Sequence, residues 1–308
     1  MASRLFGHDL VSTRDLCSED IISILDTAAT MEAMVKSKGI TQELSDKLIA
    51  CLFLEPSTRT RLSFEAAALR LGAKTISVAE ASGSSVAKGE TLSDTIRVMQ
   101  GYADCIVMRQ PQKGGAAEAA ATADIPVINA GDGAGEHPTQ ALLDLYTIRN
   151  EKESLVNLTI AMTGDLKNGR TVHSLTWALA PFAPSFIFCA PAALQMPDEI
   201  CTALDHAKIM YKKTASLEEA VKADVIYMTR IQRERFLNPE EYDALKGCFV
   251  LTRSVIEAHN PGVLVMHPLP RIDEIAPDVD TLPGAAYFRQ AHNGMYVRMA
   301  ILSLLLKK

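Results

Sequence analysis

Residues 48–54 read LIACLFL, and residues 55–61, EPSTRTR, follow them directly. Continuous rather than alternating hydrophobicity in the first segment is typical of a strand that is buried on both faces. In the second segment Ser57 is a natural N-cap, and a helical pattern begins just after it. A buried strand that leads through a short turn into a helix is the repeating unit of a parallel α/β sheet.

The same alternation of apolar runs and helical patterns recurs along the chain. The strand-like runs are Leu48–Leu54, Thr75–Val78, Cys105–Met108, Ile125–Ile128, Leu158–Thr163, Phe186–Cys189, Val225–Met228 and Val263–Met266. The clearest helical stretches between them are Asp20–Val35, Arg61–Leu71, Thr139–Arg149 and Val172–Leu179. We therefore predict an α/β fold with two doubly wound parallel-sheet domains and the active site in the crevice between them.

The chain of 308 residues suits two domains of about 150 residues each. A charged, structureless hinge is predicted at Asn150–Asn157, which places the first domain at 1–150 and the second at 151–290. The remaining segment, 291–308, is apolar nearly all round from Met295 to Leu306. A helix of this kind must be buried, and we expect it to pack back on the first domain.

Composition excludes several classes of protein. The net charge of −6 offers no electrostatic footprint for nucleic acid or for an anionic membrane. The six cysteines are scattered without metal-ligand spacing, so we expect buried thiols in a reducing cytoplasm and no metal or other cofactor. The uncharged stretch Thr171–Pro197 is cut by four prolines and is predicted to be a helix, a loop and a buried strand rather than a membrane span. The amino terminus shows no apolar leader.

Ligands of open parallel sheets bind beyond the carboxyl ends of the strands. The turn after the first strand carries Ser57, Thr58, Arg59 and Thr60 at the start of a helix. Backbone N–H groups of the first helical turn, hydroxyls and a guanidinium together make an anion site that suits phosphate. The plainer alternative is an ordinary helix cap followed by solvated arginines.

Two further strand ends in the first half carry polar residues. Arg109 follows one strand, and His137 and Gln140 stand at the start of a helix that begins with Pro138. Taken alone, Arg109 reads as a surface charge and His137 as a cap or core contact. The glycines before His137 miss the spacing of a dinucleotide-binding loop, which argues against a nucleotide site there.

The second half repeats this arrangement. Arg170 lies near a helix start after one strand, and Arg230 and Gln232 follow another. The last strand leads into residues 267–271, HPLPR, a rigid turn that can present the carbonyl of Leu269 to an ammonium group, with a cis bond possible there. Lys88 lies in a loop of small residues, which is either a plain surface loop or a mobile cover over the site.

Arginines that converge from separate strand ends indicate small, multiply anionic ligands. The first half favours phosphate and the second favours carboxylates. No nucleophilic triad, pair of catalytic carboxylates or metal cluster is evident in the sequence. The predicted chemistry is charge stabilisation and positioning rather than covalent catalysis.

The chain resembles the aspartate carbamoyltransferase catalytic chains nearly end to end. The resemblance rests on residues 57–61 (STRTR), 137–140 (HPTQ), 164–167 (GDLK), 169–175 (GRTVHSL), 267–271 (HPLPR) and 287–290 (YFRQ). The first two motifs are common to transcarbamoylases, whereas HPLP stands where ornithine carbamoyltransferases typically carry His-Cys-Leu-Pro. The resemblance implies transfer of a carbamoyl group from carbamoyl phosphate to L-aspartate, the committed step of pyrimidine biosynthesis.

The resemblance also implies roles for individual residues. The residues that would bind carbamoyl phosphate are Ser57, Thr58, Arg59, Thr60, Arg109, His137, Gln140, Leu269 and Pro270, with Thr60, Arg109 and His137 polarising its carbonyl. The residues that would bind aspartate are Arg170, Arg230, Gln232 and Lys88, the last from a neighbouring subunit of a homotrimer with shared sites. Either Ser84 or Ser85 would enter the site, and Glu55 would brace Arg170 or Arg235 on closure. A regulatory chain is possible.

Three alternatives were weighed against this interpretation. A transcarbamoylase for ornithine is disfavoured, because Arg170 and Arg230 would repel a cationic side chain. A non-catalytic sensor of carbamoyl phosphate is disfavoured by the intact set of candidate site residues. A nicotinamide-dependent dehydrogenase is disfavoured by the broken glycine pattern.

Overall fold

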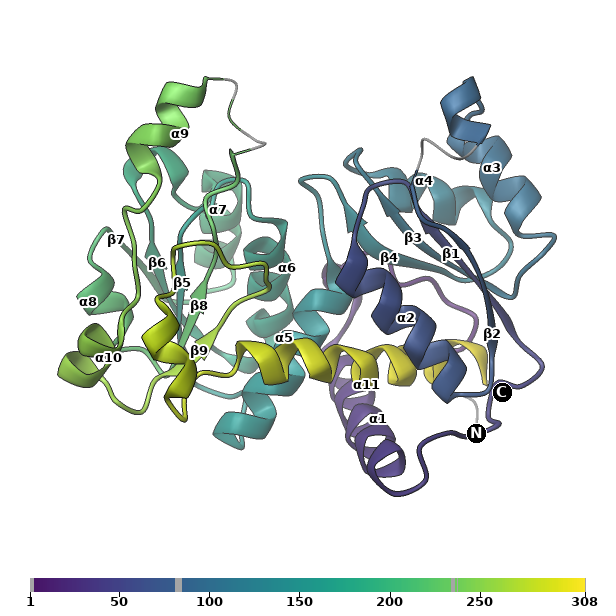
Figure 1. Ribbon diagram of the computed structural model, residues 1–308, viewed down its shortest axis with the longest axis horizontal. Helices are drawn as coiled ribbons and strands as arrows, with labels where there is room; N and C mark the ends of the chain where they lie inside the picture. The colour runs from purple at the N-terminus through teal and green to yellow at the C-terminus, as the bar shows by residue number, and fades with distance from the viewer. Residues whose placement is uncertain (1–2, 81–84, 234–235, 237, 308) are drawn as a thin grey trace. The chain divides into compact units, whose positions relative to one another are not determined.

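The structure, a computed structural model, describes residues 3–80, 85–233, 236 and 238–307. These residues form two compact units (Figure 1). The first unit comprises Met1–Tyr146 and His292–Lys308, and the second comprises Thr147–Ala291. Each unit contains one parallel sheet whose strands are joined through helices.

The first unit is built on a four-stranded parallel sheet in the order β2-β1-β3-β4. Its strands are β1 (Leu48–Phe53), β2 (Lys74–Val78), β3 (Cys105–Gln110) and β4 (Val127–Asp132). Its helices are α1 (Ser18–Ser37), α2 (Thr58–Arg70), α3 (Leu92–Met99) and α4 (Gly115–Thr122), and α5 (Pro138–Lys152) begins in this unit. Because β1 and β3 are central and covered, nearly all their residues are buried, whereas the edge strand β2 is half exposed.

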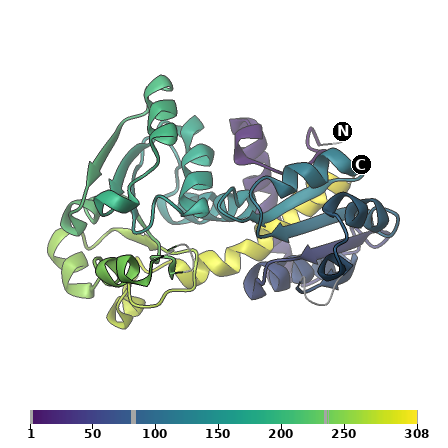
Figure 2. The same cartoon turned by 90° about the horizontal axis from the view of Figure 1, so that it is seen from above.

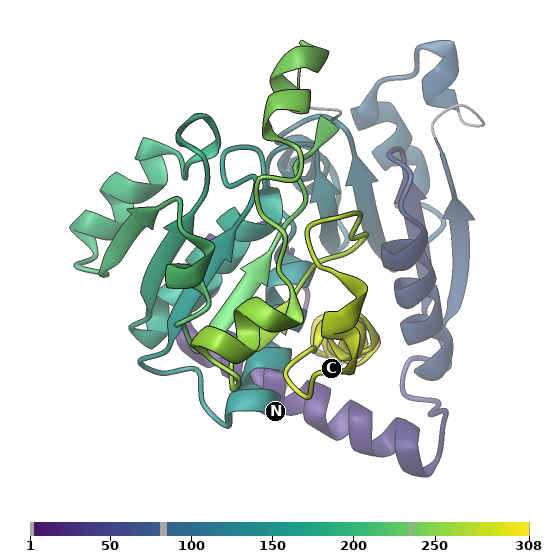
Figure 3. The ribbon, with the colours of Figure 1, turned by 60° about the vertical axis from the view of Figure 1, so that its left-hand side comes forward.

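The second unit contains a five-stranded parallel sheet in the order β7-β6-β5-β8-β9, seen from a second direction in Figure 3. Its strands are β5 (Thr159–Thr163), β6 (Ser185–Cys189), β7 (Tyr211–Thr214), β8 (Val225–Met228) and β9 (Leu264–Met266). Its helices are α6 (Arg170–Leu179), α7 (Asp198–His206), α8 (Leu217–Ala220), α9 (Pro239–Leu245) and α10 (Arg253–His259).

The parallel α/β architecture predicted from the apolar runs is confirmed, and each predicted strand is present. One strand was missed. Tyr211–Thr214 forms the edge strand β7, whose Lys212 and Lys213 are exposed, so it carries no apolar run. The predicted run Ile125–Ile128 has the wrong bounds, because β4 begins at Val127 and continues to Asp132. The polar Asn129 is buried within it, and its side chain donates to the carbonyl of Val11 at 2.9 Å.

The four predicted helices are all present within a few residues of their expected ends. Six others, α3, α4 and α7–α10, were not predicted. They are four to nine residues long, too short for a clear helical period. The hinge predicted at Asn150–Asn157 is wrong at its start, since α5 continues to Lys152. Basic residues in its last turn, Arg149 and Lys152, suit the helix dipole.

The uncharged stretch Thr171–Pro197 folds as predicted, into α6, a 3-10 helix at Ala180–Phe182 and the buried strand β6. Among the residues that the structure describes, no helix is both long enough and apolar enough to cross a membrane.

The last helix, α11 (Tyr287–Leu306), returns the chain to the first unit, as its yellow end shows in Figure 2. Its Arg298 lies over the ring of Phe64 on α2, with 5.1 Å from the guanidinium carbon to the ring centre. Lys307 pairs with Glu43 at 3.1 Å. The apolar residues of this helix that lie in the first unit are largely buried, as a helix apolar nearly all round requires.

Gly164, directly after β5, is expected to tolerate no side chain. Its φ is +116°, and a Cβ there would lie 2.1 Å from the carbonyl oxygen of Thr229, which follows β8. Gly164→Ala should lower the free energy of unfolding by about 2–4 kcal/mol, because strain and a backbone clash add. The measurement is urea unfolding followed by the fluorescence of Trp177, the single tryptophan, which lies in the second unit.

Gly247→Ala is the matched control for Gly164→Ala. Gly247 also has a positive φ, +72°, but nothing lies within 4 Å of a Cβ built there. Only the backbone penalty of about 1 kcal/mol should remain. Equal destabilisation by the two substitutions would show that the close approach of Gly164 to Thr229 is unimportant.

Candidate active site

Each sheet has one place where the strand order reverses. In the first unit it lies between β1 and β3, and in the second between β5 and β8, because the chain builds outward from each central strand in both directions. Ligands of open α/β sheets bind at the carboxyl ends of the strands at such a point. Arginines lie at or beyond the carboxyl ends of these four strands. Arg109 lies within the end of β3, and Arg59, Arg170 and Arg230 lie in the segments that follow β1, β5 and β8.

The turn after β1 leads directly into the start of α2. Ser57 is the N-cap, as predicted, with extended backbone, but its side chain makes no capping hydrogen bond, and the first turn of α2 has no acidic residue. Thr58 and Arg59 are exposed, and Thr60 is buried. An uncapped helix start that carries hydroxyls and a guanidinium suits an anion.

Partial desolvation lowers the pKa of the Arg59 guanidinium. The next arginine on the helix is held differently. Arg61 pairs with Glu65 one turn further on, at 3.3 Å. Of these two side chains, Arg59 is therefore the better placed to meet an anion at the helix start.

Arg109 lies within β3, one residue before its end, so the predicted end of this strand at Met108 is two residues too early. Its Nη2 donates to Glu55 Oε1 at 2.7 Å, and its side chain is only 12% exposed. The carboxylate thus holds the guanidinium near the end of β1, where the turn into α2 begins. The role expected for Glu55 toward Arg170 or Arg235 stays a prediction, and Arg235 lies outside the described residues.

His137 and Gln140 stand at the start of α5, which begins at Pro138 as predicted. The carbonyl of His137 accepts the backbone N–H of Gln140 at 3.0 Å, so both residues belong to the first helical turn. His137 is 4% exposed and Gln140 is 9% exposed. The side-chain nitrogen of Gln140 donates to Asp144 Oδ1 at 2.9 Å, one turn along the same helix.

In the second unit, the loop after β5 and the loop after β8 are joined by a hydrogen bond. Arg170 begins α6, with Gly169 as its N-cap, and is half-buried. Gln232 donates through Nε2 to the carbonyl of Asn168 at 3.3 Å. Arg230 lines a shallow pocket that is open to solvent, together with Gly164 and other residues of the second unit. The structure thus brings Gln232 next to the loop that leads into Arg170.

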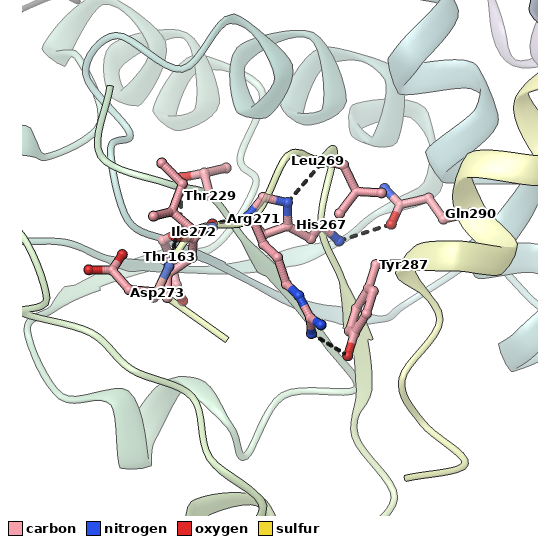
Figure 4. Close-up of polar contacts among 10 residues, drawn as sticks. Thr163, Thr229, His267, Leu269, Arg271, Ile272, Asp273, Tyr287 and Gln290 are labelled. Atoms are coloured by element: carbon pink, nitrogen blue, oxygen red, sulfur yellow. Dashed lines mark hydrogen bonds and ion pairs between the residues drawn. The ribbon is translucent and has the colours of Figure 1, made fainter. Parts of the chain in front are cut away.

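The turn after β9 is held by the imidazole of His267 (Figure 4). Its Nδ1 accepts the backbone N–H of Leu269 at 2.8 Å, and its Nε2 donates to Glu274 at 2.6 Å. The backbone N–H of His267 donates to Gln290 at 2.9 Å. Leu269 has a φ of +57°, and the Leu269–Pro270 bond is cis. These contacts give Leu269 one defined conformation.

Further along the turn, the Arg271 guanidinium donates to the hydroxyl of Tyr287 (Figure 4). It also donates to the carboxylate of Asp280 at 2.6 Å. It also lies over the Tyr287 ring, 5.3 Å from its centre. This contact anchors the far end of the turn to the start of α11.

His267 is held as the neutral Nε2–H tautomer, because a proton on Nδ1 would break the hydrogen bond from Leu269. Burial lowers its pKa, and the contact with Glu274 opposes this only in part. Burial raises the pKa of Glu274, but hydrogen bonds from His267 and from backbone N–H groups outweigh this effect and leave the value below its usual range.

We expect the second unit to lose stability as the pH falls below about 6.5. In the unfolded chain His267 takes up a proton near that pH, whereas in the folded chain its lowered pKa keeps it neutral. Its contribution is therefore fully present above pH 6.5 and decreases by up to about 1 kcal/mol for each pH unit below it. Urea unfolding followed by Trp177 at pH 7.5, 6.5 and 5.5 measures this.

The control for the pH experiment is His267→Asn, which removes the titrating group. This variant should be less stable at every pH but should show a shallower dependence between pH 7 and 5.5. Identical slopes for the two proteins would assign the dependence to another group.

Lys88 ends a 3-10 helix, Ser85–Lys88, and is exposed. Within the described residues it makes no hydrogen bond or ion pair, and the structure does not bring it together with the other candidates. Ser84 lies outside the described residues, so the choice between Ser84 and Ser85 stays open. No group of three or more His, Cys, Asp or Glu side chains among the described residues is arranged to hold a metal ion.

Two residues in contact with the candidates were missed from the sequence. Asp144 lies four residues after Gln140, a helical spacing that could have revealed it. Glu274 lies seven residues after His267 across an irregular turn, where no periodic signal exists.

Comparison with known proteins places this geometry in a family. Residues 8–150 match the model of the aspartate/ornithine carbamoyltransferase carbamoyl-P binding domain, and residues 156–305 match that of the Asp/Orn binding domain. The chain belongs to the aspartate/ornithine carbamoyltransferase family. The resemblance found in the motifs is thereby confirmed.

Relatives with closely similar sequences are named for the aspartate reaction. The aspartate carbamoyltransferase catalytic subunit of Methanosarcina acetivorans is 50% identical over 299 residues, which is 97% of each chain. That of Chromobacterium violaceum is 47% identical over 305 residues, or 99% of each chain. The chain thus falls with the aspartate carbamoyltransferases, which are transferases.

Solved structures agree with the sequence relatives. Aspartate transcarbamoylase from Trypanosoma cruzi in complex with N-(phosphonacetyl)-L-aspartic acid has a TM-score of 0.94 and 40% identity, over 99% of this chain and 98% of that one. The catalytic subunit of M. jannaschii aspartate transcarbamoylase has a TM-score of 0.89 and 48% identity, over 97% of each chain.

Proposed function

We propose that the chain transfers the carbamoyl group of carbamoyl phosphate to the α-amine of L-aspartate, giving N-carbamoyl-L-aspartate and phosphate. The observation that carries the proposal is that cationic side chains follow the central strands of both sheets, where α/β folds bind ligands. Structures of the T. cruzi enzyme in complex with carbamoyl phosphate and aspartate support it.

The phosphate of carbamoyl phosphate binds at the start of α2. Its oxygens accept hydrogen bonds from the hydroxyls and backbone N–H groups of Ser57, Thr58 and Thr60, and from the guanidinium of Arg59. The uncapped helix start, without acidic residues, supports this assignment. Arg109, held by Glu55, supplies a further cation.

The carbamoyl group is oriented by neutral and charged donors on one side and by acceptors on the other. Thr60, Arg109 and His137 polarise its carbonyl oxygen. Gln140 and the backbone around Leu269 and Pro270 accept hydrogen bonds from its NH2 group. Support comes from the position of Gln140 in the first turn of α5 and from the defined conformation of Leu269.

The two carboxylates of aspartate bind to Arg170, Arg230 and Gln232. A planar guanidinium can pair with a carboxylate through two parallel hydrogen bonds, which selects a dicarboxylate over a cationic amino acid. The contact between Gln232 and Asn168 supports a joint role of the two loops. Lys88 completes this site from a neighbouring subunit.

The reaction follows from these positions. The lone pair of the neutral α-amine attacks the carbamoyl carbon, and the negative charge that develops on the carbonyl oxygen is stabilised by Thr60, Arg109 and His137. The C–O bond to phosphate then breaks with its electron pair on the phosphate, and a phosphate oxygen takes the amine proton. The mechanism uses only groups of the chain and its substrates, without a metal or other cofactor.

The assembly and location of the enzyme are part of the proposal. A homotrimer with shared sites, to which a regulatory chain can bind, fits relatives that are named as catalytic subunits. A cytoplasmic place in pyrimidine biosynthesis fits the reaction and the cysteines, of which four are buried thiols. Cys17 and the exposed Cys248 depart from the expectation of buried thiols.

The test of the proposed function is an assay of ureido product from carbamoyl phosphate, with L-aspartate and L-ornithine as separate acceptors. We expect turnover with aspartate alone. Turnover with ornithine would overturn the assignment of Arg170 and Arg230. Saturable binding of carbamoyl phosphate without turnover of either acceptor would instead identify a binding protein.

A further inference from the structure

Two buried side chains of the first unit, one acidic and one basic, lie outside the machinery proposed above. Asp144 on α5 is fully buried, and Arg298 on α11 is 3% exposed. Ionised groups are expensive to bury, so they are retained where they hold something in place. Gln140, which is proposed to bind the carbamoyl NH2 group, contacts Asp144 directly.

The contact between Gln140 and Asp144 determines which way the glutamine amide faces. Gln140 Nε2 lies 2.9 Å from Asp144 Oδ1. An ionised carboxylate only accepts hydrogen bonds, so the NH2 end of the amide must face it. The carbonyl oxygen, on the other branch of the same planar amide, then faces away from Asp144. It is the correct partner for a donor such as the carbamoyl NH2 group.

Asp144 favours the charged form of a second buried side chain, Arg298. Burial lowers the pKa of Arg298 to about 9, and the attraction of Asp144 opposes this lowering, so the guanidinium remains charged at neutral pH. The Arg298 guanidinium packs closely against Gly294, where a glycine leaves room for it. A Cβ at this position would lie only 2.4 Å from Arg298 Nη1. The ring of Phe64 covers its face.

We propose that Asp144, through its hydrogen bond with Gln140, fixes the Gln140 amide with its oxygen toward the carbamoyl nitrogen, and so selects an acyl phosphate that carries NH2 over one that carries a methyl group. The inference rests on the proposed function and names Asp144 as a positioning residue. Without the carboxylate of residue 144, the Gln140 side-chain amide can rotate. Its NH2 group then faces the NH2 group of carbamoyl phosphate, and no hydrogen bond forms between the two donors. A methyl group in the same place neither gains nor loses a hydrogen bond.

The experiment compares two acyl donors of nearly the same shape, carbamoyl phosphate and acetyl phosphate, with L-aspartate as acceptor and full-length protein. For Asp144→Asn we expect kcat/KM with carbamoyl phosphate to fall about 10- to 100-fold, and that with acetyl phosphate to change less than about threefold. The ratio of the two constants therefore collapses. An unchanged ratio would overturn the proposal, since a merely structural role lowers both constants alike.

Asp132→Asn is the matched control. Asp132 is another buried carboxylate of the first unit, but it accepts the backbone N–H groups of Gly114 at 2.8 Å and Glu136 at 2.6 Å. Its replacement should lower both constants together and leave the ratio unchanged. Should Asp144→Asn fail to fold, Asp144→Glu keeps the charge opposite Arg298 but displaces the carboxylate, and the ratio should fall at least threefold.

Gln140→Leu separates this inference from the proposed function. It should lower the ratio as Asp144→Asn does, and the double variant should lower it no further. If Gln140→Leu leaves the ratio unchanged, the proposed role of Gln140 itself is wrong. If Gln140→Leu lowers the ratio but neither Asp144 variant does, only the positioning role of Asp144 is wrong.

Discussion

Arg59→Ala is expected to lower kcat by roughly 100- to 1000-fold, the range found when one group that stabilises developing charge is removed. As the bond to phosphate breaks, negative charge grows on the departing oxygens, and Arg59 is the cation at the helix start that meets them. Its lowered pKa indicates that it is partly desolvated before any ligand binds, which strengthens its attraction for an anion. Initial rates at saturating substrates measure kcat.

A second readout for Arg59→Ala uses inorganic phosphate alone as a competitive inhibitor. Its inhibition constant should rise at least tenfold, because the same guanidinium binds the free anion. The control is Arg97→Ala on α3, an exposed arginine whose partner Asp94 is 4.0 Å away. Both constants should stay within about twofold of the wild type. Normal phosphate inhibition in Arg59→Ala would place the phosphate elsewhere.

Arg230→Ala is expected to lower kcat/KM for L-aspartate by at least about 100-fold and to leave the KM for carbamoyl phosphate within about threefold. Two charge-assisted hydrogen bonds to one carboxylate are lost, together about 3 kcal/mol or more. Arg230→Lys should restore little, since an ammonium group cannot form the planar pair of bonds. Steady-state kinetics with each substrate varied in turn separate the two effects.

The control for Arg230→Ala lies three residues along the same segment. Arg233 is exposed, and Arg233→Ala should change neither constant by more than about threefold. If Arg230→Ala instead weakened carbamoyl phosphate and left aspartate unaffected, the division of the two substrates between the two units would be wrong.

Much of the candidate site could be predicted because parallel strands align their carboxyl ends. Arg59, Arg109 and Arg230 are far apart in sequence, yet each is recognisable from its place at the end of an apolar run. The apolar runs are visible in the sequence because the strands are buried on both faces. The start of α5 could be predicted because proline favours the first position of a helix. The edge strand β7 was not predicted, because its exposed lysines make its sequence as polar as that of a loop.

The partners of the candidate residues show where such reasoning ends. His267 was predicted only as part of a rigid turn. In the structure its ring forms hydrogen bonds with Leu269 and Glu274, and its backbone N–H donates to Gln290. The last of these comes from α11, 23 residues further along the chain. Arg298 lies over the ring of Phe64 only because α11 returns to the first unit.

The pattern of residues along the chain was therefore enough to predict the sheets, the helix starts and the cationic residues at the strand ends. These features depend on the spacing of apolar residues and on the backbone preferences of neighbouring residues. The lowered pKa and tautomer of His267 and the burial of Arg298 against Phe64 depend on groups that are distant in sequence. Such contacts form only when the units fold, because desolvation and hydrogen-bond geometry are set by three-dimensional packing.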